Sequence, residues 1–234
     1  HVVLGVSDIH LAKKLRMSRA AAVRAIAESV ARARRCVERV QFSAEDASRA
    51  DPVFLRQCAQ ADRVRARGVL GADPVFLRQC AQAAADAGAS RVNLPDTVGC
   101  AVPEEYGAMI ADVAAFLDRS VVVSAHCHND LGLATANTLA AVRAGARQVE
   151  GCVNGLGERA GNAAVEEVAA ALRLKRIAAT GIRLEQAADI SRLVAEAAGV
   201  PVQPNRALVG ANAFTHSSGI HQDGILKDPE TYEF

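Results

Sequence analysis

Two histidines stand two residues apart in the stretch Ser-Ala-His-Cys-His-Asn-Asp, residues 124–130. Valines precede this stretch, which predicts a buried strand running into it. Because side chains alternate along a strand, His126 and His128 face the same side. Two imidazoles on one face suit a Zn, Mn or Fe ion and leave positions for a substrate. Taken alone, the pair is equally compatible with two partly buried histidines that hold no metal.

A second polar stretch, Asn-Gly-Leu-Gly-Glu-Arg-Ala-Gly-Asn, occupies residues 154–162 and has three glycines in nine residues. One interpretation is an ordinary turn between a strand and a helix. The other is a loop whose glycines let the backbone approach a ligand. In that case Asn154 or Asn162 could offer an amide oxygen to a metal.

Two further polar stretches, at residues 42–47 and 93–99, follow predicted strands. Glu45 is expected just beyond a strand end, where a carboxylate can act in acid–base chemistry. Thr97 can donate a hydrogen bond to a substrate carboxylate. Helix capping is the alternative, since Ser and Thr are common capping residues.

The segment 215–224 contains two histidines, His216 and His221, among serines and glycines. This composition is not typical of a core helix. Either the segment is a solvated loop, or it belongs to a second module that supplies a general acid or base.

Short apolar runs alternate with amphipathic stretches along most of the chain, which predicts parallel βα units. The predicted strands are residues 2–6, 39–43, 91–95, 120–126 and 147–153. The predicted helices are residues 18–36, 73–87, 103–118 and 131–144, followed by helices near 160–173 and 184–198 and a polar tail from 205.

Five βα units fit either an open doubly wound sheet or part of a TIM (β/α)8 barrel. Polar residues end successive strands here, as in barrels, whereas an open sheet uses mainly the ends beside its switch point. We therefore expect an α/β fold with the last five units of a partial barrel in residues 1–180. The start of a small helical subdomain is expected in residues 181–234.

The sequence Ala-Asp-Pro-Val-Phe-Leu-Arg-Gln-Cys-Ala-Gln-Ala occurs at residues 50–61 and again at 72–83. A solenoid needs at least three repeats. Because packing requires only similar apolar patterns and these copies are identical, we interpret residues 50–83 as a local tandem duplication.

The composition excludes several classes of protein. With a formal net charge of +1, the chain gives no electrostatic reason to expect nucleic acid or an anionic membrane as partner. It has no apolar run long enough to span a bilayer. Its six cysteines are scattered without a Cys-x-x-Cys pair, which is typical of reduced thiols in the cytoplasm.

Five stretches occur in a recognisable order: FSAEDA, LPDTVG, HCHNDLGLA, QVEG with NGLGERAGN, and GANAF with SGIHQDGILK. Together they resemble the 2-isopropylmalate synthases, within the superfamily that includes homocitrate synthase, citramalate synthase and the hydroxymethylglutaryl-CoA lyases. The resemblance implies a TIM barrel followed by a helical subdomain, in a homodimer. It implies a Claisen condensation of acetyl-CoA with 2-oxoisovalerate in leucine biosynthesis, dependent on a divalent metal (Mn, Zn or Mg).

The resemblance also implies roles for individual residues. The metal ligands would be His126, His128 and Asn162. The substrate contacts would be His1, Ser43, Asn93, Pro95 and Thr97. The acid–base group would be Glu45 with His221, and Tyr232 matches a catalytic tyrosine that the partner subunit contributes in the family.

The sequence also departs from the family. It lacks the Arg-Asp-Gly-Glu-Gln motif of the first barrel strand, which supplies an aspartate ligand and a substrate-binding arginine. It begins at what resembles the fourth strand, and it lacks the C-terminal domain that gives leucine feedback. We therefore expect weakened metal binding and impaired activity. An inactive truncated fragment with unpaired sheet edges and a homocitrate or citramalate synthase remain the alternatives.

Overall fold

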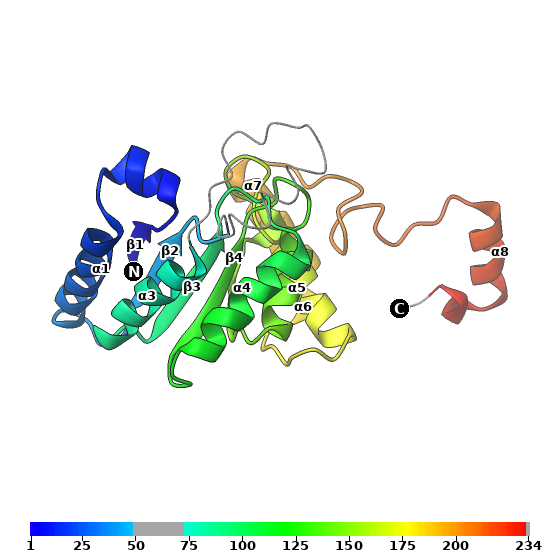
Figure 1. The fold of residues 1–234 in the computed structure, drawn as a ribbon. Helices are drawn as coiled ribbons and strands as arrows, with labels where there is room; N and C mark the ends of the chain where they lie inside the picture. The colour runs from blue at the N-terminus through cyan, green and yellow to red at the C-terminus, as the bar shows by residue number, and fades with distance from the viewer. Residues whose placement is uncertain (49–72, 233–234) are drawn as a thin grey trace, which may run out of the picture. The chain divides into compact units, whose positions relative to one another are not determined.

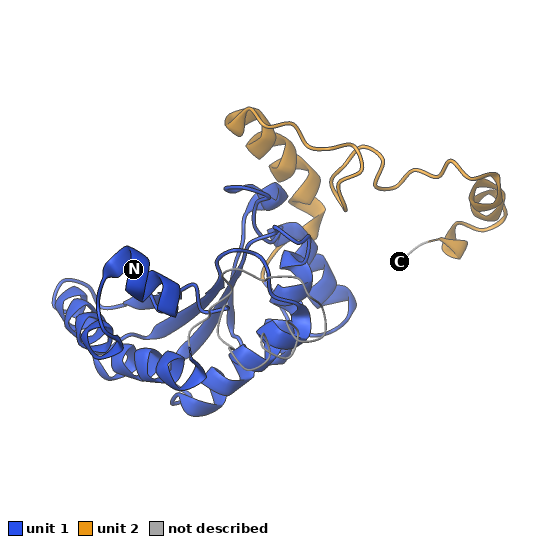
Figure 2. Cartoon of the chain, turned by 45° about the horizontal axis from the view of Figure 1, so that its top comes forward, with its two compact units in different colours: residues 1–180 blue, residues 181–234 orange. Residues whose placement is uncertain are grey.

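A computed structural model describes residues 1–48 and 73–232 of the chain (Figure 1). The chain divides into two compact units, His1–Thr180 and Gly181–Phe234 (Figure 2). The first unit contains one parallel sheet whose strand order follows the sequence, β1-β2-β3-β4-β5. Its strands are β1 (Val2–Gly5), β2 (Gln41–Glu45), β3 (Arg91–Asp96), β4 (Val122–Cys127) and β5 (Gln148–Glu150).

Helices connect successive strands and pack side by side along one face of the sheet (Figure 1). Local sequence explains where they begin: Ser18 accepts a hydrogen bond from the Ala21 amide, and Asp73 accepts one from the Val75 amide. The helices are α1 (Arg19–Arg34), α3 (Pro74–Asp86), α4 (Pro103–Phe116), α5 (Ala134–Arg143) and α6 (Val165–Leu174). The predicted helices are confirmed, with ends that differ by up to five residues.

The strand order decides between the two candidate architectures. An open doubly wound sheet reverses its strand order at a switch point, and this sheet does not. The sheet is also curved. Its curvature is evident from a 2.9 Å hydrogen bond that Gln148 on β5 donates to Gln41 on β2. Three strand spacings would separate these strands by about 14 Å in a flat sheet. The predicted fold class, part of a TIM barrel, is confirmed.

The two faces of the sheet differ in chemistry. Residues under the helices are apolar and buried, such as Phe42, Val92 and Ala125. Residues that alternate with them lie on the concave face and are polar although buried, such as Ser43 and Asn93. Burial of polar groups requires hydrogen-bond partners, so the concave face must carry a connected polar network.

Three local predictions need correction. The second strand ends two residues later than predicted, so Glu45 is the last residue of β2 and not a loop residue beyond it. The last strand is shorter than predicted, because the chain turns into a 3-10 segment at Val153–Gly155 with Asn154 at a φ of 61°. The segment His10–Leu15, η1, forms a π-helix that the sequence did not predict.

The duplicated segment is described in part. Its second copy forms the beginning of α3. The first copy, residues 50–61, lies outside the described residues.

The second unit contains η3 (Leu184–Gln186), α7 (Ala187–Ala198), α8 (Gly219–Lys227) and η4 (Pro229–Thr231). Helix α7 ends at Gly199, whose φ of 66° suits glycine. His221 lies in α8, so of the two interpretations of residues 215–224 the solvated loop does not describe this position. No helix in the described parts of either unit is long and apolar enough to cross a membrane.

Candidate metal and substrate site

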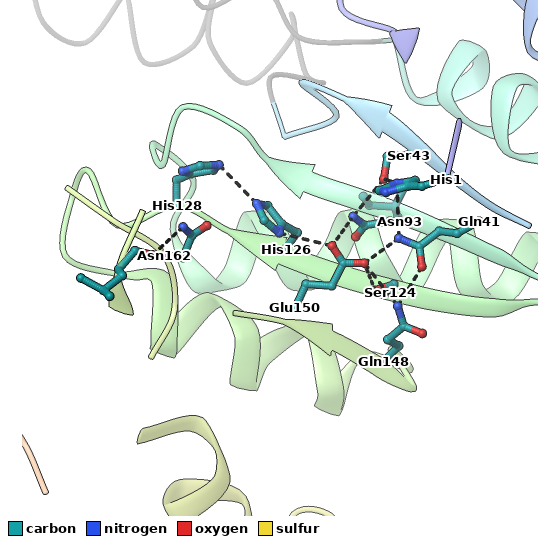
Figure 3. Close-up of polar contacts among 12 residues, drawn as sticks. His1, Gln41, Ser43, Asn93, Ser124, His126, His128, Gln148, Glu150 and Asn162 are labelled. Atoms are coloured by element: carbon teal, nitrogen blue, oxygen red, sulfur yellow. Dashed lines mark hydrogen bonds and ion pairs between the residues drawn. The ribbon is translucent and has the colours of Figure 1, made fainter. Parts of the chain in front are cut away.

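The two histidines of the HxH stretch face each other. His126 lies in β4 and His128 follows it, and their Nε2 atoms are 3.3 Å apart (Figure 3). Two imidazole nitrogens bound to one tetrahedral zinc ion at ordinary bond lengths would be about 3.3–3.4 Å apart. The observed separation therefore fits two ligands of a single metal ion.

An amide lies beside this pair. Asn162 pairs with His128 in an isolated antiparallel bridge, and Figure 3 shows its side chain next to the His128 ring. Its Nδ2 donates to the carbonyl of Leu156 at 2.9 Å, whereas its buried Oδ1 has no hydrogen-bond partner among the described residues. Asn154, the other candidate, instead directs its backbone N–H at the Glu166 carboxylate. The geometry favours Asn162 as the third ligand.

These residues fit a divalent metal but do not form a complete set. Among the described residues there is no cluster of three or more His, Cys, Asp or Glu side chains that could hold a metal. Burial, then the proximity of His126 and Arg159, lowers the pKa of His128. A neutral imidazole is the form that binds a metal, and this environment favours the neutral form of His128.

Glu150, which the sequence analysis did not single out, stands at the centre of the concave polar face (Figure 3). Its Oε2 lies 3.4 Å from Nδ1 of His126, the ring nitrogen on the far side from His128. Burial alone would raise the pKa of Glu150, but contacts with His126 and Gln41 outweigh it, and the pKa is lowered. The glutamate is therefore ionised beside the candidate metal ligand. It went unnoticed because its partners come from distant strands.

Three of the predicted substrate contacts form one hydrogen-bonded group. His1 Nε2 lies 2.6 Å from the Ser43 hydroxyl, and Asn93 Nδ2 donates to the same hydroxyl at 3.1 Å. Pro95 lies beside His126 in the register of β3 and β4. Asn93 also donates to Glu150, which contacts His126, so the group of His1, Ser43 and Asn93 lies near the histidine pair on the same concave face.

The other predicted substrate contact is engaged within the protein. The hydroxyl of Thr97 accepts a 2.8 Å hydrogen bond from the Asp46 amide and so ties the loop after β3 to the loop after β2. This contact joins two loops and is not the helix cap of the alternative interpretation. The hydroxyl keeps its own proton, which it can still donate.

The predicted acid–base group also has partners. Lys14 in the π-helix η1 donates to both carboxylate oxygens of Glu45, at 2.7 and 2.8 Å. His10, from the same segment, lies 3.8 Å from Glu45. The unpredicted π-helix therefore determines which basic side chains surround this carboxylate.

Arg159 links three of the four polar stretches of the first unit, residues 93–99, 124–130 and 154–162. Its guanidinium donates to both oxygens of Asp130, at 2.9 and 3.1 Å, and to the carbonyl of Thr97 at 2.7 Å. Arg159 and Asp130 lie inside stretches that the sequence analysis quoted, but their pairing was missed. Since Asp130 is two residues from His128, the arginine holds the loop that carries a candidate ligand.

The glycines of residues 154–162 serve the packing of the loop on itself. A Cβ on Gly157 would lie 2.0 Å from Nδ2 of Asn162, and a Cβ on Gly161 would lie 2.0 Å from the carbonyl oxygen of Gly155. These contacts let the loop fold tightly enough to bring Asn162 to His128. The approach of a ligand to this backbone stays a prediction.

The remaining predicted catalytic residues lie in the second unit. The rings of His216, His221 and Tyr232 form a cluster, with centroids 4.6 Å apart for His221 and Tyr232. Glu45 and His221 belong to different compact units, so their pairing stays a prediction.

Comparisons with known proteins agree with these observations. The family model HMGL-like matches residues 1–70 and 63–194, and the model "Homocitrate synthase post-HMGL domain-like" matches residues 208–234. The 2-isopropylmalate synthase of Pelotomaculum thermopropionicum is 50% identical over the whole chain, and that of Methylacidiphilum infernorum is 49% identical. The chain covers only 43% of each of these relatives.

Solved structures show the same fold. The hydroxymethylglutaryl-CoA lyase of Pseudomonas aeruginosa matches with a TM-score of 0.68 at 22% identity, over 86% of this chain and 63% of the lyase. An Acinetobacter lyase in complex with coenzyme A and 3-methylmalate matches with a TM-score of 0.66 over 92% of this chain and 67% of that one. The chain therefore belongs to the HMGL-like family, and it is similar over its whole length to part of the 2-isopropylmalate synthases, which are acyltransferases.

Proposed function

We propose that the protein containing this chain condenses acetyl-CoA with 2-oxoisovalerate to give 2-isopropylmalate and free coenzyme A, in leucine biosynthesis. The observation that carries the proposal is the pair of facing Nε2 atoms of His126 and His128 beside the unpartnered Oδ1 of Asn162. The relatives at 44–50% identity that bear the name of this enzyme support the choice of reaction.

His126, His128 and Asn162 would hold the divalent metal. Two imidazoles favour Zn or Mn over Mg, which prefers oxygen ligands. When bound, the metal acts as a Lewis acid that polarises the keto carbonyl of the 2-oxo acid. Ser43 and His1 are within reach of the same region, where Ser43 can donate a hydrogen bond to the substrate carboxylate.

Glu45 would act as the base. It accepts a methyl proton from acetyl-CoA, and the resulting carbanion forms a new C–C bond to the keto carbon, whose oxygen ends as a hydroxyl after protonation. Water then cleaves the thioester, so that its carbonyl carbon becomes the second carboxylate of 2-isopropylmalate, while coenzyme A leaves as the free thiol and one proton is released. Lys14 would have to share or release Glu45 during this cycle, since it now contacts both carboxylate oxygens. His221 and Tyr232 would supply or remove the remaining protons, the roles that the resemblance implies for them.

The chain spans less than half of the curated relatives that it matches. The Arg-Asp-Gly-Glu-Gln motif is not among its residues. We therefore propose that this chain alone binds metal more weakly than a complete relative and has impaired activity. We also propose that the protein is a homodimer and is located in the cytoplasm. Analytical ultracentrifugation of the complete protein tests the dimer.

The test has two arms with separate outcomes. Titration of the metal-free chain with Co²⁺ is expected to produce visible d–d absorption that His128→Ala abolishes; an unchanged spectrum in His128→Ala would refute the metal site. Thiol release from acetyl-CoA is then measured with 2-oxoisovalerate, 2-oxoglutarate and pyruvate. Faster release with 2-oxoglutarate or pyruvate would replace the proposal by a homocitrate or citramalate synthase. Metal binding without thiol release from any of them would identify an inactive chain.

A further inference from the structure

We propose that Glu150 is a positioning residue that sets the tautomer of His126, so that the proton lies on Nδ1 and the lone pair of Nε2 is free for a metal. The Oε2 atom of the carboxylate lies 3.4 Å from Nδ1, which has no closer hydrogen-bond partner among the described residues, while Nε2 lies 3.3 Å from Nε2 of His128. An imidazole beside a carboxylate places its N–H toward that carboxylate. This inference rests on the metal site proposed above, but it concerns the metal-free chain.

The surroundings of Glu150 require an acceptor at both carboxylate oxygens. Gln41 and Gln148 donate to Oε1 through their amide nitrogens, at 2.6 and 3.2 Å, and the Ser124 hydroxyl lies 3.4 Å from the same atom. Asn93 donates to Oε2 at 3.1 Å. Since the other neighbours of the carboxylate all donate hydrogen bonds to it, the favourable arrangement for His126 is that its Nδ1 also carries a proton directed at the carboxylate.

This arrangement predicts what a glutamine would do at position 150. Its amide nitrogen cannot replace Oε1 without facing both glutamine amides, so it must replace Oε2. The amide nitrogen of the glutamine would then face Nδ1 of His126. Because this amide donates a hydrogen bond, Nδ1 would have to be unprotonated to accept it. Nδ1 would lose its proton to Nε2, the atom that should bind the metal. Asn93 can accommodate the change by turning its amide, since its Oδ1 is buried without a partner among the described residues.

The same reasoning assigns His128. With a lone pair on Nε2 of His126, the 3.3 Å contact requires His128 to donate from its own Nε2. The Nδ1 of His128 is then unprotonated, and it has no hydrogen-bond partner within the described part of the chain. The two histidines are thus unlike in the metal-free state: His126 is already in the ligand form, and His128 must exchange its proton when a metal arrives.

Long-range ¹H–¹⁵N NMR of the metal-free chain measures these tautomers directly. We expect the Nδ1–H form for His126 and the Nε2–H form for His128 in the wild type, and the Nε2–H form for His126 in Glu150→Gln. The exposed Glu28 of α1 provides the matched control, since Glu28→Gln makes the same chemical change. It should leave the wild-type pattern intact.

The outcomes separate this inference from the proposed function. His126 in the Nε2–H form in the wild type overturns the inference, even if Glu150→Gln fails to fold. An unchanged tautomer in a folded Glu150→Gln also overturns it. In a chain that binds Co²⁺, Glu150→Gln should weaken binding by about 10–100-fold. A chain that does not bind Co²⁺ but shows the expected tautomers refutes the metal site and supports the role of Glu150.

Discussion

Replacement of Gly161 by alanine tests whether backbone packing within the loop positions the third ligand. Gly161 has a φ of +90°, and a Cβ there would lie 2.0 Å from the carbonyl oxygen of Gly155, where ordinary contact begins at 3.4 Å. That carbonyl accepts the Asn162 amide at 3.0 Å, and the carbonyl of Gly161 accepts the Asn129 amide at 2.9 Å. The methyl group therefore cannot be accommodated without moving backbone that holds both the HxH loop and Asn162.

The magnitude follows from these contacts. A left-handed alanine costs about 1–2 kcal/mol, and loss of the two backbone hydrogen bonds costs about 1 kcal/mol each. We expect Gly161→Ala to lower the free energy of unfolding by about 3–4 kcal/mol in total. In the folded fraction, displacement of Asn162 should weaken Co²⁺ binding as well.

The matched control is Gly132→Ala, because Gly132 also has a positive φ, +74°, but a Cβ there meets nothing within 4 Å. Gly132→Ala should lower the free energy of unfolding only by the cost of placing alanine at a positive φ, about 1–2 kcal/mol. Urea denaturation followed by circular dichroism at 25 °C measures both variants. If Gly161→Ala loses no more stability than Gly132→Ala within about 0.5 kcal/mol, the backbone contact does not hold the loop and the reasoning is refuted.

Two further predictions concern the histidine loop. Burial, with a smaller effect of His126 and Arg159, lowers the pKa of His128, so the unfolded chain takes up a proton near pH 6.5 that the folded chain does not. The free energy of unfolding of the metal-free chain should therefore fall as the pH decreases below about 6.5, and His128→Gln should remove part of that slope; equal slopes in urea denaturation between pH 5 and 7.5 would contradict it. Arg159→Lys should lower stability by about 1 kcal/mol, because an ammonium group cannot bond both oxygens of Asp130 and the Thr97 carbonyl in the same planar geometry. A lysine variant with wild-type urea stability and Co²⁺ affinity would show that the arginine does not support the HxH loop.

Much of the first unit could be predicted from local patterns. Short apolar runs predicted the strands and amphipathic stretches predicted the helices, and the structure shows that Ser18 and Asp73 cap two of those helices. The facing of His126 and His128 followed from their spacing alone. Errors arose where a tertiary contact changed the end of an element, as at Glu45 and Val153.

The sequence by itself determined the number and order of the βα units and which residue types stand at the strand ends. These features depend on neighbours a few positions apart, through alternation, capping and periodicity. The family resemblance had already pointed to Asn162 over Asn154. Only the tertiary structure decided that the Asn162 side chain lies beside His128, that Arg159 holds Asp130, and that Glu150 lies behind His126. Those contacts depend on the curl of the sheet and on a loop folding back on itself, which join residues that no local pattern connects.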